Sequence, residues 1–201
     1  GALIHGTGEH VDIVGTDGKR LSIVRVLEHK HDPFKIILPQ GICQILSRAA
    51  KNVSVGSAEI KIDANDRIAR FRWRDVEFMT KLVDAQYPGY EKLILPKSEQ
   101  PIRFDGPAML RALIRGQGAV EADADGKTRS VRLTGMGDGS VAIYAGSPDG
   151  VEFFDEIECA GPALNAEFQI GFLRDAMLAF GGGQVEMHAP PENRRIPGMR
   201  I

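Results

Sequence analysis

The sequence predicts an α+β fold in which a strand, a helix and further strands recur as a unit. Three observations carry this prediction. Gly and Pro recur at short intervals, alternating apolar positions fill the intervals, and three segments have helical spacing instead. The helices and strands are therefore expected in segregated layers, with helices on one face of antiparallel sheets.

Strands are predicted where apolar and polar residues alternate between turn signals. Residues 11–14 and 21–26 flank Asp17 and Gly18, and Asp-Gly between two β-branched runs predicts a hairpin. Further strands in the first half are predicted at 34–38, 59–62, 68–73 and 76–83. The second half repeats the pattern, with strands predicted at 102–104, 130–133, 141–144, 151–158, 168–170 and 185–188.

Helices are predicted where apolar residues recur at the third and fourth positions. In the first helix the apolar stripe is formed by Ile42, Ile45, Leu46 and Ala49. Pro suits the first turn of the second helix, and an Asp just before it suits the cap. Three glycines after Phe180 end the third helix. The predicted ranges are 39–51, 107–116 and 170–180.

Length and composition limit the class of protein. The chain has 201 residues, 43% hydrophobic and 26% charged, which supports one or two domains with their own cores. We expect two, at 1–95 and 96–201. The net charge of −2 excludes a uniformly basic nucleic-acid coat. No apolar run approaches the roughly 20 residues that span a bilayer, so no membrane partner is expected. Cys43 and Cys159 are interpreted as reduced thiols of a cytoplasmic protein.

The predicted helices are basic although the whole chain is slightly acidic. They carry one acid, Asp175, against five basic residues: Arg48, Lys51, Arg111, Arg115 and Arg174. A cationic surface made of helix sides, without aromatic side chains for base stacking, suits contact with the phosphate backbone of DNA. The alternative is that long cationic side chains simply solvate the polar faces of amphipathic helices.

The sequence contains no persuasive catalytic constellation. The run from Glu28 to Asp32 includes His29 and His31 and looks like a metal cluster, but no matched pair of ligands is spaced elsewhere. No Ser lies in a nucleophile elbow. We therefore expect no metal, no cofactor and no enzymatic activity. A small metal-dependent cytoplasmic enzyme that uses His29 and His31 remains as an alternative.

Three short stretches resemble one known family. Residues 16–21 read T-D-G-K-R-L and resemble the T-D-G-x-R-L signature of bacterial DNA sliding clamps, the beta subunit of DNA polymerase III. Residues 81–90 read K-L-V-D-A-Q-Y-P-G-Y and resemble the family's segment at the junction of its second and third domains. Residues 198–201 resemble its P-M-R-L tail. The resemblance covers essentially the whole chain, but only the latter part of a clamp.

The resemblance implies a DNA-clamp fold and a function without chemistry. In that family helices line a central hole, sheets form the outer wall, and two protomers close head to tail around duplex DNA. Residues 1–95 would be the back part of clamp domain 2, and residues 96–201 would be domain 3. The protein would bind double-stranded DNA without sequence preference and make replication processive. A diverged paralogue that serves only as a partner-binding platform is the alternative within the same fold.

The resemblance also implies a hydrophobic cleft for short peptides of DNA polymerase and clamp-loader subunits. Leu or Phe anchors of these peptides would enter the cleft, while arginines hold peptide carbonyls or carboxylates at the rim. Carried over by motif, the cleft residues are Thr16, Gly18, Lys19, Arg20, Leu21, Pro88, Lys92, Leu93, Met199, Arg200 and Ile201.

Overall fold

The computed structural model describes residues 1–27, 32–51, 67–73, 76–121, 130–135, 137–146, 152–189 and 199–201. Within them the chain divides into two compact units, Gly1–Lys92 (unit 1) and Leu93–Ile201 (unit 2). The predicted boundary after residue 95 lies close to this division, and the assignment of the units to two clamp domains stays a prediction. The predicted strand at 59–62 lies outside the described residues, as do His29 and His31.

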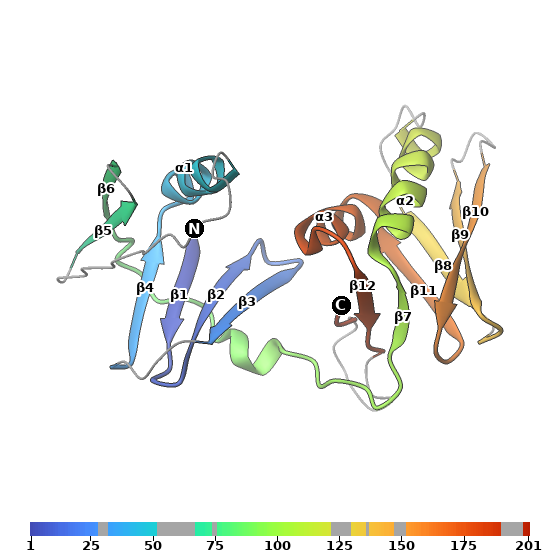
Figure 1. Ribbon diagram of the computed structural model, residues 1–201, viewed down its shortest axis with the longest axis horizontal. Coiled ribbons are helices and arrows are strands. Elements are labelled where there is room, and N and C mark those ends of the chain that lie inside the picture. The colour runs from blue at the N-terminus through green and yellow to red at the C-terminus, as the bar shows by residue number, and fades with distance from the viewer. Residues whose placement is uncertain are drawn as a thin grey trace. The chain divides into compact units, whose positions relative to one another are not determined.

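Unit 1 is built on a four-stranded sheet with the order β3-β2-β1-β4, in which all neighbours are antiparallel (Figure 1). The strands are β1 (Ala2–Gly6), β2 (His10–Thr16), β3 (Leu21–Leu27) and β4 (Phe34–Leu38). The predicted hairpin around Asp17 and Gly18 is confirmed, since it joins β2 to β3. The sequence reasoning does not predict β1, whose two sheet neighbours make it a central strand.

One face of this sheet carries the core of unit 1. The face is covered by α1 (Gln40–Lys51) and by the hairpin of β5 (Ile68–Trp73) and β6 (Val76–Lys81). In α1, Ile42 is buried and Leu46 packs against the core, whereas Ile45 is 46% exposed. The buried core residues are Ile4, Val11, Ile36, Leu38, Ile42, Ala69 and Phe71.

Unit 2 contains a six-stranded antiparallel sheet with the order β11-β8-β9-β10-β7-β12. The strands are β7 (Ile102–Asp105), β8 (Ser130–Gly135), β9 (Ser140–Gly146), β10 (Glu152–Ala160), β11 (Leu164–Gln169) and β12 (Gln184–Met187). The helices α2 (Gly106–Glu121) and α3 (Ile170–Phe180) pack against one another and against the core of the sheet. The predicted α+β class, with antiparallel sheets and few helices, is confirmed.

The second helix begins as predicted and ends later than predicted. The backbone N–H of Ala108 donates to Asp105 Oδ2 at 2.8 Å, which confirms Asp105 as the cap. Gly116 suggested a helix end, but it lies inside α2 because the helix passes close to β10. A Cβ at Gly116 would lie 2.9 Å from Phe153 Cδ1, so a larger residue here would force the Phe153 side chain to shift.

Candidate functional site

The turn between β2 and β3 is held rigid by its own side chains. Thr16 Oγ1 donates to the carbonyl of Arg20 at 2.7 Å and accepts the N–H of Gly18 at 3.1 Å. Asp17 Oδ1 accepts the N–H groups of Lys19 and Arg20, each at 3.0 Å. These two N–H groups hold the pKa of Asp17 below its usual value. The turn therefore presents Lys19 and Arg20 to solvent from a preorganised backbone.

The segment after β6 lies on the sheet face opposite the core of unit 1. Tyr87 Oη donates to the carbonyl of Val14 at 3.1 Å, and Tyr90 Oη reaches Asp12 on the same strand. Pro88 is exposed between these two anchors. Leu21 is half-buried and lies directly opposite Thr16, on the sheet face that carries Asp12. Unit 1 thus brings Leu21 and the segment around Pro88 to one sheet face.

A buried polar network fixes this segment to the sheet. Asp12 is 3% exposed, and its carboxylate accepts two hydrogen bonds from Arg25, at 2.8 and 3.0 Å. Tyr90 Oη donates to Asp12 at 3.3 Å and lies 2.8 Å from His5 Nδ1, while His10 Nε2 lies 3.6 Å from Asp12. The Arg25 hydrogen bonds lower the pKa of Asp12, and burial raises the pKa of Tyr90 to about 12.

The sequence held a signal for the Asp12–Arg25 pair that the motif analysis did not use. The structure pairs Thr16 with Leu21 across the hairpin, and the same register places Asp12 opposite Arg25. Opposite charges at directly facing positions stabilise a strand pair. By contrast, no local pattern links either residue to Tyr90, because that contact joins segments 78 residues apart.

Three predicted cleft residues, Met199, Arg200 and Ile201, lie at the C-terminal end of unit 2. Met199 and Ile201 pack against the core of the unit. Between them, Arg200 pairs through its backbone with His188 and donates from its guanidinium to the carbonyl of Leu95 at 2.8 Å. Lys92 and Leu93 are exposed in the short 3₁₀ helix η1 (Tyr90–Leu93).

The predicted DNA-contacting cations differ in exposure and in whether the structure gives their side chains a bonding partner. Arg48 is exposed on α1, and the side chain of Lys51 lies outside the described residues. Arg115 is bonded to Asp155 on β10, and this bond lowers the pKa of Asp155. Arg174 donates to Gln117 on α2 at 2.5 Å and to Asp175 at 3.1 Å.

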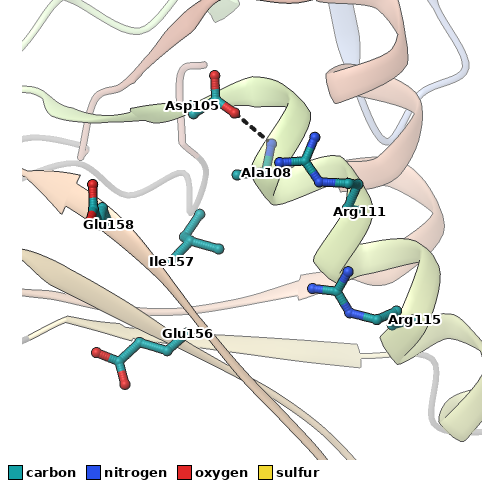
Figure 2. Close-up of a pocket in the computed structure, with 7 residues that line it drawn as sticks. All are labelled: Asp105, Ala108, Arg111, Arg115, Glu156, Ile157 and Glu158. Atoms are coloured by element: carbon teal, nitrogen blue, oxygen red, sulfur yellow. Dashed lines mark hydrogen bonds between the residues drawn. The ribbon is translucent and has the colours of Figure 1, made fainter.

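A cavity of about 410 Å³ lies between α2 and β10 (Figure 2). Arg111 and Arg115 reach into it from the helix, and Glu156 and Glu158 come from the strand. Arg111 is exposed and has no hydrogen-bond or ion-pair partner among the described residues. It is therefore the cation of this cavity that is most available to an anion or a partner.

The edge of β10 beside this cavity is the feature that the sequence reasoning missed. β10 pairs with β9 along residues 152–158, but it pairs with β7 only at Cys159 and Ala160. Along 152–158 its second edge therefore has no strand partner among the described residues. Glu152, Glu156 and Glu158 alternate on one side of this strand, and this period of two was visible in the sequence.

Among the described residues, no three side chains of His, Cys, Asp or Glu gather in a way that could hold a metal ion. Nor does any helix in these ranges combine the length and apolar character that crossing a bilayer requires.

The known proteins that this chain resembles are bacterial DNA sliding clamps. Residues 1–89 match the family model described as the DNA polymerase III beta subunit, central domain. The chain is 26% identical over 190 residues to the beta sliding clamp of Pseudomonas aeruginosa, covering 92% of this chain and 49% of the relative. It is 23% identical over 191 residues to the clamp of Escherichia coli K12, covering 93% and 50%. The chain thus spans about half the length of the curated relatives it matches.

Solved structures agree with the sequence matches. The DNA polymerase III subunit beta from Pseudomonas aeruginosa superposes with a TM-score of 0.81 at 23% identity, over 96% of this chain and 52% of that one. A putative DNA polymerase III beta subunit from Eubacterium rectale gives a TM-score of 0.79 at 16% identity, over 94% and 51%. The predicted clamp fold and the resemblance to the beta subunit of DNA polymerase III are confirmed.

Proposed function

We propose that this chain is the DNA-contacting and partner-binding portion of a DNA sliding clamp. The premise is that it has the fold of a bacterial beta sliding clamp and shares sequence with such clamps across both units. Residues 1–95 would be the back part of clamp domain 2, and residues 96–201 would be domain 3. The proposed role is to tether polymerase to duplex DNA in the cytoplasm, without a catalytic site of its own. The observation that carries the proposal is the continuous sequence similarity to a beta sliding clamp over 92% of the chain.

Contact with DNA phosphates is assigned first to Arg48 and Arg111. Both are exposed on helices, whereas Arg115 and Arg174 already hold carboxylate or amide partners. Phosphate contacts made by free cations release counterions, so the affinity should fall as salt rises. Because such contacts do not read bases, they would allow the protein to slide.

The DNA test uses fluorescence anisotropy of a labelled duplex between about 50 and 200 mM salt. Replacing both Arg48 and Arg111 with Glu should weaken DNA binding. It should also reduce the slope of the logarithm of the binding constant against the logarithm of the salt concentration by about 2. Arg132→Glu is the matched control, since Arg132 is exposed on β8 beside Tyr144, on the side of the sheet away from the core. Unchanged affinity of the double variant for DNA would refute the assignment of Arg48 and Arg111 to phosphate contact. If the protein then still bound peptide, a clamp paralogue that serves only as a partner-binding platform would be favoured.

Peptide binding is assigned in unit 1 to the rigid turn, to Leu21 and to the segment around Pro88. The preorganised turn and the two tyrosine anchors mean that little ordering is needed when a peptide binds. The proposed ligand is a short hydrophobic peptide with Leu or Phe anchors, of the kind that polymerases and clamp loaders would carry. Calorimetry should show a lower affinity for Leu21→Ala, whereas Ile13→Ala serves as control because Ile13 is 40% exposed on the opposite sheet face. Equal affinities would contradict the assignment.

Ring closure is assigned to the edge of β10. A strand edge that lacks a partner can accept a strand from a second protomer, and its glutamates favour a basic partner surface. In sedimentation of the native protein, replacing Glu156 and Glu158 with Lys should raise the dissociation constant of the dimer about tenfold. Glu167→Lys on β11 is the control, and an unchanged dimer would refute this closure.

A further inference from the structure

Three segments of unit 2 meet at one histidine. His188 follows β12 and is 4% exposed. Its Nδ1 accepts the backbone N–H of Ser98 at 3.0 Å. Its own backbone N–H donates to the carbonyl of Arg200 at 2.6 Å, and its carbonyl accepts the Arg200 N–H at 3.2 Å. The Arg200 guanidinium donates to the carbonyl of Leu95 at 2.8 Å and so links the tail to the segment that contains Ser98.

The hydrogen bond from Ser98 fixes the chemistry of the ring. A backbone N–H can only donate, so Nδ1 must offer a lone pair and the imidazole proton must lie on Nε2. An imidazolium carries protons on both nitrogens and cannot accept this bond. Protonation of His188 therefore breaks the bond to Ser98 and leaves its N–H facing a positive ring.

Several charged groups surround His188. Glu186 Oε2 lies 3.6 Å from Nε2. Arg103 is bonded to the same carboxylate at 2.9 Å, and the charge of Lys97 also acts on that carboxylate. Arg200 adds a further cation, directed at the carbonyl of Leu95. In the protonated state the hydrogen bond from Ser98 to the ring is lost, whereas the bond from Arg200 to Leu95 does not involve the ring.

We propose that His188 is a positioning residue that ties Ser98, and with it segment 95–98, to the end of β12 only while its ring is neutral. The same segment carries the Leu95 carbonyl that accepts from Arg200, so its loosening would weaken a support of the tail. The part of this inference that concerns peptide affinity rests on the proposed function and on the predicted cleft role of Met199, Arg200 and Ile201. Acid would then loosen the segment that supports the tail and weaken peptide binding, without His188 touching the peptide. The device works between pH 5 and 8, where imidazoles ordinarily titrate.

The primary test is hydrogen exchange at the Ser98 amide between pH 5 and 8, corrected for the intrinsic exchange rate. In the wild-type chain, protection at pH 5 should be roughly three- to tenfold lower than at pH 8. The Gly106 amide is the internal control, since it donates to the carbonyl of Gly183 at 2.8 Å and its acceptor does not titrate. Equal protection of Ser98 at both pH values would overturn the proposal.

Two variants separate the acceptor from the charge. In His188→Asn the side-chain oxygen lies near the place of Nδ1 and can accept from Ser98 at every pH, so protection should be flat. In His188→Leu no acceptor remains, so protection should be low throughout; retained protection would overturn the proposal. If the Leu variant does not fold, the contrast between wild type and His188→Asn decides.

Calorimetry with a Leu- and Phe-containing peptide then tests the functional half. Its affinity should fall with Ser98 protection in the wild type and stay constant in His188→Asn. If the peptide binds at no pH, the proposed function fails while the exchange data still judge His188. If it binds equally at pH 5 and 8 although Ser98 loses protection, the link between His188 and the peptide is wrong.

Discussion

Replacing Tyr90 with Phe removes one oxygen from the polar network of unit 1 and leaves the ring in place. Tyr90 is 2% exposed, and its hydroxyl donates to Asp12 at 3.3 Å while it accepts from His5 at 2.8 Å. The ring keeps its edge contact with His5, with centroids 6.0 Å apart. The variant therefore loses hydrogen bonds without opening a large cavity.

The expected cost follows from the partners left behind. Two lost hydrogen bonds, together with a His5 N–H that loses its acceptor, amount to about 1–3 kcal/mol in the free energy of unfolding of unit 1. The His5 side chain is 15% exposed, so water can replace part of the loss. Since burial raises the pKa of Tyr90 to about 12, the hydroxyl stays protonated throughout the assay.

The assay is urea unfolding followed by tryptophan fluorescence. The chain has one Trp, at position 73 in β5, so the signal reports on unit 1. Tyr87→Phe is the matched control, because the Tyr87 hydroxyl bonds to backbone and donates to the carbonyl of Val14 at 3.1 Å. Tyr90→Phe should cost more than Tyr87→Phe. An equal or smaller cost would refute the view that the network fixes this segment.

Three further predictions concern titration and backbone strain. Arg25 lowers the pKa of Asp12, so the contribution of the Asp12 carboxylate to stability is present above about pH 4 and is lost as the pH falls below that value. Asp12→Asn should therefore be less stable at pH 7. Its free energy of unfolding should also fall less steeply with acid in unfolding titrations. Gly161 has φ +136°, and a Cβ there would meet backbone at 2.7 Å. Gly161→Ala should therefore destabilise unit 2 by about 1–3 kcal/mol in calorimetric melting. Gly146 lies in open space, so Gly146→Ala should change the stability of unit 2 by less than ~1 kcal/mol. Burial raises the pKa of the Cys159 thiol, so its labelling by maleimide should be slow at pH 7 and accelerate above pH 9.

Local patterns predicted the helices and strands well because apolar spacing and turn residues close in sequence determine where each one begins and ends. The helix at 170–180 has the predicted bounds because a glycine run follows an apolar stripe, and Gly181 adopts the left-handed conformation that ends it. Gly116 shows the limit of the same rule. A glycine that ends a helix and a glycine that lets a strand approach look identical in sequence, and only Phe153 distinguishes them.

The site was less accessible to sequence reasoning because its contacts join distant segments. The turn at 16–21 was recognised as a motif, and its side-chain hydrogen bonds explain why Thr and Asp occupy it. His188 belongs to no motif, and its role depends on a backbone N–H 90 residues away. The cations predicted from helix composition also proved unequal, since composition could not reveal that Asp155 lies beside Arg115.

The strand order of unit 2 has a consequence for the synthesis of the protein. β7 lies between β10 and β12, so the first strand of the unit to leave the ribosome gains both of its neighbours only after β12 has been made. Until then one edge of β7 keeps unpaired backbone N–H and C=O groups, and long-range strand pairing is slow to form. Translation that stalls before residue 184 would therefore leave a nascent chain in need of a chaperone, even though unit 1 had already folded.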